Sequence, residues 1–309
     1  MENNKKTDPG FGRNYNPNLK RLINKDGSYN VIKSGKIDGI RDIYLYLLNI
    51  NWMLFSCIII SYFVIANLIF ALLYFIIGDI GLNFNWTSSP LHNFSQCFFF
   101  STQTFTTVGY GLISPIHYSS SIIASTEALF GLLSFSIATG LMYGRFSKPN
   151  AKIIFSKNAL ISPYKENKTA LMFRLVNQRK SDISNVEAKV IVSMFEKDQN
   201  TQQYKRTFYS LDLEIESIRF FPSTWTIVHE ITPESPLFKF ANKCTSEAKI
   251  EISIFIEGFD ENFSQTVHIR HSYLQHEIIE DAKFRPSYYI DEDGYTNIDI
   301  SKLGDYDKA

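Results

Sequence analysis

The sequence of 309 residues lacks a net charge, because 31 Lys and Arg residues balance 31 Asp and Glu residues. This balance argues against a nucleic-acid partner, whose binding needs a basic surface. Cysteine is scarce as well, and Cys57, Cys97 and Cys244 show no CxxC spacing. A disulfide framework and a cysteine-based metal site are therefore not expected.

Signatures of catalysis are also missing. The sequence has no nucleophile elbow, no phosphate-binding glycine loop and no paired-carboxylate signature. His268 and His271 lie three residues apart in a segment with strand periodicity, where such residues point to opposite faces. Neither an enzyme nor a bound cofactor is predicted.

The most informative absence is that of cations between residues 43 and 144. This interval holds no Lys or Arg, and its only acids are Asp79 and Glu127. Much of the abundant phenylalanine, 26 residues in the whole chain, falls within it. A soluble domain needs charged surface residues throughout, whereas a membrane segment excludes them. We therefore expect residues 41–148 to form a membrane domain.

Two runs in this interval are long enough to cross a bilayer. Residues 52–77 carry no charge, and residues 119–145 carry only Glu127 before the closing Arg145. Tyr74 is expected at a membrane interface, because it lies near the end of the first run. The sequence thus predicts two transmembrane helices.

The flanks of these spans predict their orientation. Basic residues lie beyond both outer ends of the pair, which predicts a multi-pass inner (cell) membrane protein with both termini cytoplasmic. Residues 41–51 predict an amphipathic slide helix on the inner membrane surface, the alternative being that they form the first turns of the following span. Within the first span, Asn67 is expected to form a hydrogen bond between helices.

Between the spans lies an apolar run, residues 94–105, that is too short to cross and leads into residues 107–111, which have the sequence TVGYG. A re-entrant helix aims the partial negative charge of its C-terminus at a cation path. A potassium filter needs successive backbone carbonyls that replace the water shell of the ion, and glycine tolerates the backbone angles involved. We therefore predict a pore helix over residues 94–105 and a selectivity filter of Thr107, Val108, Gly109, Tyr110 and Gly111, with K⁺ bound at the first four.

One such segment cannot surround an ion. No second TVGYG sequence occurs in the chain. Known potassium filters use four-fold cyclic symmetry, so a homotetramer follows from the filter hypothesis.

Residues 149–309 follow a different pattern, with apolar residues at every second position. Val186, Ala188, Val190 and Val192 alternate with polar residues, and residues 250–257 show the same period. Several such runs separated by turn clusters predict an all-β sandwich. Residues 1–40, rich in Gly and Pro, are expected to form a cytoplasmic N-terminal arm, in which residues 29–32 predict a short strand.

Several motifs resemble those of the prokaryotic inward-rectifier potassium channels, the KirBac family, and the resemblance covers nearly the whole chain. The matching segments are DIY at 42–44 leading to Trp52, FFSTQT at 99–104, YGRFSKP at 143–149, TWTIVH at 224–229, SPL at 235–237 and HIRHSY at 268–273. The resemblance implies a membrane α-helical pore domain, with two transmembrane helices and a re-entrant pore helix, followed by an all-β immunoglobulin-like sandwich domain. That second domain would extend the conduction path and carry regulation.

The resemblance also implies roles for single residues. Tyr143, with Met142, falls at the inner helix crossing, where a hydrophobic constriction gates by dewetting. Phe135 falls where strongly rectifying relatives carry an acid or amide, so strong block from the cavity is not expected. Gln103 and Thr104 fall behind the filter, and Gln103 replaces a bracing Glu.

Two features of the second span keep alternatives open. Glu127 either faces the lumen or braces the back of the filter, and the second reading matches the family. Gly131, Phe135, Thr139 and Met142 recur at helical spacing, so this face lines either the cavity or the contact with the first span. The resemblance favours the cavity.

Arg145 and Lys148 lie where the headgroups of anionic membrane lipids would be, although positive-inside topology also explains them.

The predicted function is a homotetrameric potassium-selective channel. One alternative is a membrane-anchored β-sandwich that binds a ligand or partner without conducting. Another is a cation channel of low selectivity, because Gln103 and Leu112 depart from the family pattern.

Overall fold

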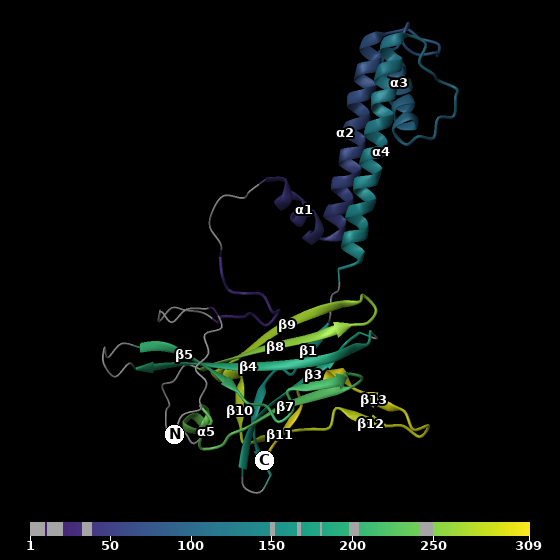
Figure 1. Cartoon of the computed structure of the whole chain (residues 1–309). Coiled ribbons are helices and arrows are strands. Elements are labelled where there is room, and N and C mark those ends of the chain that lie inside the picture. The colour runs from purple at the N-terminus through teal and green to yellow at the C-terminus, as the bar shows by residue number, and fades with distance from the viewer. Residues whose placement is uncertain are drawn as a thin grey trace. The chain divides into compact units, whose positions relative to one another are not determined.

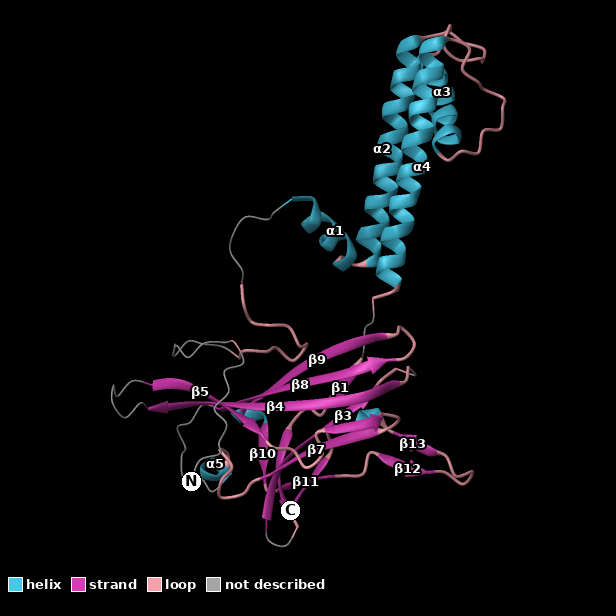
Figure 2. Ribbon diagram, viewed as in Figure 1, coloured by secondary structure: helices cyan, strands magenta, loops and turns pink. Residues whose placement is uncertain are grey.

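The computed structural model describes residues 10, 21–32, 39–148, 152–165, 168–179, 181–197, 204–241 and 250–309. The chain divides into two compact units, one of residues 35–148 and one that joins residues 1–34 to residues 149–309 (Figure 1). Figure 2 shows helices and loops in the first unit and mainly strands in the second. The expected fold class, a helical membrane domain followed by a β-sandwich, is confirmed. Cys244 lies outside the described residues.

The first unit contains four helices: α1 (Gly39–Asn49), α2 (Trp52–Ile77), α3 (Pro90–Phe105) and α4 (Tyr118–Phe146). α2 and α4 are long and apolar enough to cross a membrane. They lie side by side, and α3 packs at the end of the pair that is away from α1 (Figure 1). α1 begins and ends two residues earlier than the expected 41–51, and α4 extends one residue beyond each end of 119–145.

α3 begins at Pro90, four residues before the expected start of this helix. Ser89 caps it, since its hydroxyl accepts the His92 N–H at 3.4 Å, and Pro90 occupies the first turn, where no N–H is needed. Asn93 then holds the preceding loop, because its side chain exchanges two hydrogen bonds of 2.9 Å with the Thr87 backbone. The first turn is thus built by polar residues, which hydrophobicity alone assigns to a loop.

Two five-stranded sheets form the second unit. The first has the order β1-β3-β2-β10, with β7 also paired to β3, and the second has the order β5-β4-β8-β9, with β6 also paired to β4. Among the described strands, the β10–β2 pair is parallel and the others are antiparallel. The strands of the first sheet are β1 (Ile153–Phe155), β2 (Ala159–Tyr164), β3 (Lys168–Asn177), β7 (Thr224–Glu230) and β10 (Ile278–Glu280). Those of the second are β4 (Ile183–Lys197), β5 (Tyr204–Leu211), β6 (Ser217–Phe220), β8 (Ile250–Asp260) and β9 (Gln265–Leu274).

Smaller elements complete this unit. β11 (Ala282–Phe284) pairs with β14 (Tyr306–Lys308), and β12 (Tyr288–Ile290) pairs with β13 (Thr296–Ile298). Three short helices, α5 (Phe238–Ala241), η1 (Gln275–Glu277) and η2 (Ile300–Lys302), connect strands.

The two large sheets enclose one apolar core. Val190 of β4 and Ile254 of β8 are at most 1% exposed, as are Phe173 of β3 and Ile227 of β7 from the opposite sheet. The period-two prediction is therefore confirmed on this face. Burial of each large apolar side chain contributes roughly 1.5–3 kcal/mol, so this core supplies most of the driving force for folding.

The polar face of β8 differs from the solvated surface that alternation suggests. Glu251 and Ser253 are each 3% exposed. Arg206 of β5 donates to one Glu251 carboxylate oxygen at 2.7 Å, and the Leu22 N–H of the N-terminal arm donates to the other at 2.7 Å. Residues 22 and 23 of the arm cover this face at Glu251, so both sides of β8 are buried over residues 250–254.

The arm segment 21–30 is a tight hairpin. Ile23 and Tyr29 form an isolated antiparallel bridge, and the Asn30 N–H donates to the Leu22 carbonyl at 3.0 Å. The expected strand over residues 29–32 is reduced to this one bridge, because the turn around Gly27 folds the segment back onto itself.

We expect Arg206→Met to lower the free energy of unfolding by about 3–5 kcal/mol, because it leaves the Glu251 carboxylate buried without its cation. Lys165→Met is the matched control: it removes the cation of the exposed Lys165–Glu214 pair and is expected to change stability by less than about 1 kcal/mol. Urea unfolding followed by the β-sheet circular dichroism signal measures both. Equal losses in the two variants would contradict the assignment.

Candidate functional site

The segment after α3 has an alternating backbone. Thr107, Gly109 and Gly111 have φ of 57°, 53° and 80°, whereas the intervening Val108 and Tyr110 do not have positive φ. Alternation of this kind turns successive carbonyl groups toward the same side of the chain. Glycine adopts positive φ without cost, but Thr107 is strained there, so the surrounding structure must hold it.

Backbone hydrogen bonds hold the segment against the end of α3. The Gln103 carbonyl accepts the N–H groups of Val108 at 2.9 Å and Gly109 at 3.3 Å, and the Thr104 carbonyl accepts the Thr107 N–H at 3.0 Å. The Thr104 hydroxyl donates back into the helix, to the Phe100 carbonyl at 2.9 Å. Gln103 and Thr104 thus hold the segment through their main chain, and the predicted support of a filter by their side chains stays a prediction.

The far end of the segment is fixed to the loop that precedes α3. The Asn83 N–H donates to the Ser114 carbonyl at 2.9 Å, and the Ile116 N–H donates to the Gly81 carbonyl at 3.1 Å. The Ser120 hydroxyl, in the first turn of α4, also donates to the Gly81 carbonyl at 2.7 Å. Both ends of residues 106–116 are therefore anchored within the chain.

Glu127 lies fully buried between α2, α3 and α4. The Tyr74 hydroxyl donates to one of its carboxyl oxygens at 2.7 Å, and the Ser101 hydroxyl contacts the other. Ser101 also lies 3.0 Å from the Asn67 side-chain oxygen. Glu127 therefore joins α4 to α2 and α3, and its support of the 107–111 segment stays a prediction. Asn67 joins helices as predicted.

Tyr74 corrects the sequence prediction of an interfacial aromatic residue. It is fully buried, because its hydroxyl finds a partner in Glu127, which a hydrocarbon environment cannot supply. Tyr74 and Ser101 are the two residues of this cluster that the sequence analysis missed. The available signal was spacing: Asn67 and Tyr74 lie seven residues apart, on one face of α2.

Gly131 has a different neighbour from Phe135, Thr139 and Met142, the other residues of the predicted stripe on α4. A Cβ built on Gly131 would lie 2.0 Å from the carbonyl oxygen of Phe105, the last residue of α3. α4 can therefore approach the end of α3 only because residue 131 has no side chain.

The remaining residues of that stripe do not face the first span. Phe130 packs 6.3 Å from the Phe70 ring, and the Ser134 hydroxyl lies 2.7 Å from that of Tyr62, so these residues make the contact with α2. The stripe residues Phe135, Thr139 and Met142 are exposed in the single chain, as is the neighbouring Tyr143.

Arg145 connects the end of α4 to α1. Its guanidinium donates to the carbonyls of Leu47 and, at 2.7 Å, Ile50, and it lies 4.6 Å from the ring centre of Trp52. Cations at a helix C-terminus stabilise its free carbonyls, so Arg145 caps α1. Lys148 donates to the Asn49 side chain in the same region.

We expect Gly131→Ala to destabilise the helical unit by at least about 1–3 kcal/mol, because the new methyl group overlaps the Phe105 backbone. Gly140→Ala is the control on the same helix, since a Cβ at Gly140 meets nothing within 4 Å. Thermal unfolding in detergent measures both. If Gly131→Ala unfolds at the same temperature as Gly140→Ala, the contact is wrong.

The chain is similar to known ion channels over most of its length. A family model described as "Inward rectifier potassium channel C-terminal domain" matches residues 153–308, and one described as "Ion channel" matches residues 62–148. The inward rectifier potassium channel Kirbac3.1 of Paramagnetospirillum magnetotacticum is 33% identical over 285 residues, covering 92% of this chain and 94% of its own length. The human G protein-activated inward rectifier potassium channel 2 is 26% identical over 306 residues, covering 92% of this chain and 71% of its own length.

These matches extend over both units, and the relatives are ion channels rather than enzymes. Together with the two candidate spans, they show that this is a membrane protein. The chain belongs to the inward rectifier potassium channel family.

Proposed function

We propose that the chain forms a potassium-selective channel whose filter is residues 107–111. The observation that carries this proposal is the alternating backbone of this segment, held by the Gln103 carbonyl at the C-terminus of α3. Carbonyls turned to one side can replace the water shell of K⁺, with ions bound at Thr107, Val108, Gly109 and Tyr110.

We propose that four copies assemble around the filter. Each chain carries one filter segment, and Tyr110 is 79% exposed and Val108 53% exposed in the single chain. Large apolar side chains left bare beside a membrane pore need a protein neighbour, and neighbouring copies supply it. The C-terminus of α3 then directs its partial negative charge toward the axis, where it favours a cation.

Conduction in this proposal is passive and needs no cofactor. Several weak carbonyl sites bind K⁺, and repulsion between ions moves them on. The bare face of α4 lines the inner cavity, with Phe135 and Thr139 along it, and Met142 and Tyr143 narrow it at the inner end. An aromatic residue at 135 gives blocking cations no charged partner.

Both termini and the β domain lie on the cytoplasmic side of the inner membrane, where the β domain regulates the gate.

Flux from liposomes tests the proposal. Under K⁺, Na⁺ and large-cation gradients we expect the protein to pass K⁺ alone, and barium to block it. Gly109→Ala is expected to remove this selectivity or the flux itself, because alanine resists the left-handed backbone that residue 109 adopts.

Gly140→Ala is the control, since it adds the same methyl group to open space. Equal K⁺ and Na⁺ flux through the wild type would favour a cation channel of low selectivity. A folded tetramer without flux would favour the membrane-anchored binding protein.

We further propose that Arg145 and Lys148 attract anionic lipid headgroups. Neutralising both with Gln is expected to weaken the apparent affinity for anionic lipid about thirtyfold, since each charge contributes roughly 1 kcal/mol near such a surface. Flux measured against the fraction of phosphatidylglycerol in the vesicles gives this affinity. Asn49→Ala is the control, because it breaks the Lys148 contact without changing charge. An unchanged lipid response in the double variant would leave both residues with a structural role only.

A further inference from the structure

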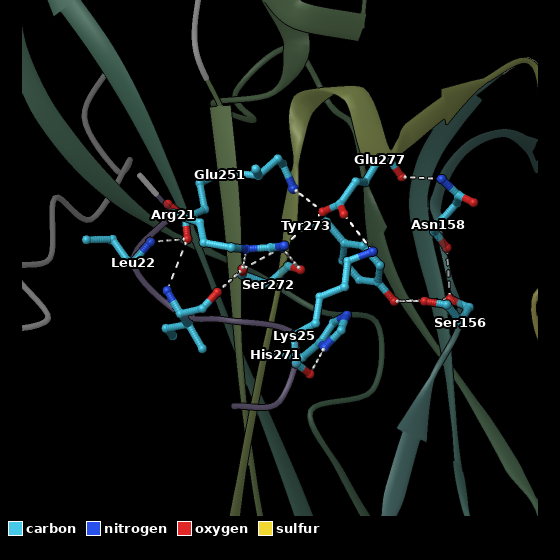
Figure 3. A network of polar contacts seen from close by, with 12 residues as sticks. Arg21, Leu22, Lys25, Ser156, Asn158, Glu251, His271, Ser272, Tyr273 and Glu277 are labelled. Carbon is cyan, nitrogen blue, oxygen red and sulfur yellow. Dashed lines mark hydrogen bonds and ion pairs between the residues drawn. The ribbon is translucent and has the colours of Figure 1, made fainter. Parts of the chain in front are cut away.

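The N-terminal arm wraps around β9, which is the edge strand of its sheet (Figure 3). Arg21 donates to the Ser272 carbonyl at 2.7 Å, and the Ser272 hydroxyl donates to the Ile23 carbonyl. A Cβ on Gly27 would lie 2.9 Å from the Arg270 carbonyl, so the turn of the arm touches the strand backbone. The arm therefore covers an edge that would otherwise be open to pairing.

Glu277, in the 3-10 helix after β9, is the charged anchor of this contact. Its carboxylate accepts Arg21 at 3.0 Å and Lys25 at 2.6 Å, and it also accepts the Leu274 N–H at 2.9 Å. Its backbone carbonyl accepts the Asn158 side chain at 3.2 Å (Figure 3). One residue thus holds both the arm and the turn that precedes β2.

His271 lies beneath the arm. Among the described residues, no carboxylate forms a hydrogen bond with its ring. It is 7% exposed, and its ring stacks on Phe155 of β1 with 4.5 Å between ring centres. Its Nδ1 lies 3.2 Å from the Lys25 carbonyl, so the neutral ring donates through Nδ1. Within the described part of the chain, its Nε2 has no hydrogen-bond partner.

The groups that face His271 disfavour a proton on Nε2. Arg21 and Lys25 of the arm are cations, and Glu277 is the one acid among the charged groups that act on the ring. Tyr273 of the same strand meets it edge-on, 4.8 Å away, and Phe155 of β1 adds only apolar surface. Protonation would bury a positive charge beside these two cations and leave the Nε2–H without an acceptor.

We propose that residues 21–30 form an acid-released latch, docked on β9 while His271 is neutral and released when His271 takes up a proton. The latch is held by Glu277, whose backbone carbonyl also accepts the Asn158 side chain in the turn before β2. Release therefore removes both arm cations from the residue that holds this turn.

The direction of the pH effect follows from the docked and free states. Burial lowers the pKa of docked His271 from 6.5 to about 4. The docking equilibrium constant is thus highest well above pH 6.5 and falls as the pH drops toward 4, by about twentyfold between pH 7 and pH 5. Burial raises the pKa of Glu277, but the Lys25 and Leu274 hydrogen bonds and the two cations bring it below its usual value, so Glu277 adds to release only at lower pH.

Hydrogen exchange of the full-length protein in nanodiscs tests the latch. The Leu22 N–H donates to Glu251 only when the arm is docked, so its protection, corrected for the intrinsic pH dependence of exchange, reports docking. We expect that protection to fall about twentyfold from pH 7 to pH 5 in the wild type and less than about twofold in His271→Gln. His271→Phe, which keeps the ring stack on Phe155, supplies the same test if the Gln variant misfolds.

His268→Gln is the matched control, because His268 lies three residues away on the same strand with its side chain exposed. It should keep the pH dependence of the wild type. Protection that does not change from pH 7 to pH 5 in the wild type would overturn the proposal. So would an equal fall in the wild type and His271→Gln, since release would then depend on another group.

Discussion

Non-helical backbone at membrane depth is stable only where protein groups satisfy its amides and carbonyls. The amides of residues 106–109 meet this demand by hydrogen bonds to the end of α3, so the position of that helix decides the shape of this part of the loop. α3 in turn depends on one buried polar cluster, in which Ser101 and Tyr74 meet Glu127. An incomplete cluster of this kind would leave a carboxyl unpaired in an apolar medium, at a cost of several kcal/mol. The three helices are therefore fixed together rather than separately.

Features with a local cause could be predicted from the sequence. The spans follow from the length of the apolar runs, and Gly109 and Gly111 follow from the backbone angles that carbonyl alternation needs. Tyr74 could not be placed, because an aromatic residue near the end of a span serves an interface or a buried hydrogen bond equally well. Gly131 was predicted on the right helix, but its contact with the end of α3 depends on how two helices pack.

In the β domain, too, features with a local cause could be predicted, whereas contacts with segments distant in the sequence could not. Alternation predicted which residues of β8 enter the core, since burial on that face is a property of the strand alone. It could not predict that Glu251 is buried as well, because the covering segment lies 229 residues earlier in the chain. A charged residue in an alternating strand signals only that the second face is polar. Whether water or protein satisfies that face is settled by tertiary contacts.

The guanidinium of Arg145 has a mechanical consequence. By holding the Leu47 and Ile50 carbonyls, it joins the last turn of α4 to the end of α1, so a rotation of α4 about its axis must carry α1 with it. α1 presents exposed apolar residues such as Ile43 and Leu45, which an interfacial helix buries among lipid headgroups. A force that displaces α1 therefore reaches the last turn of α4 as torque, so the surroundings of α1 contribute to the resistance of α4 to twisting.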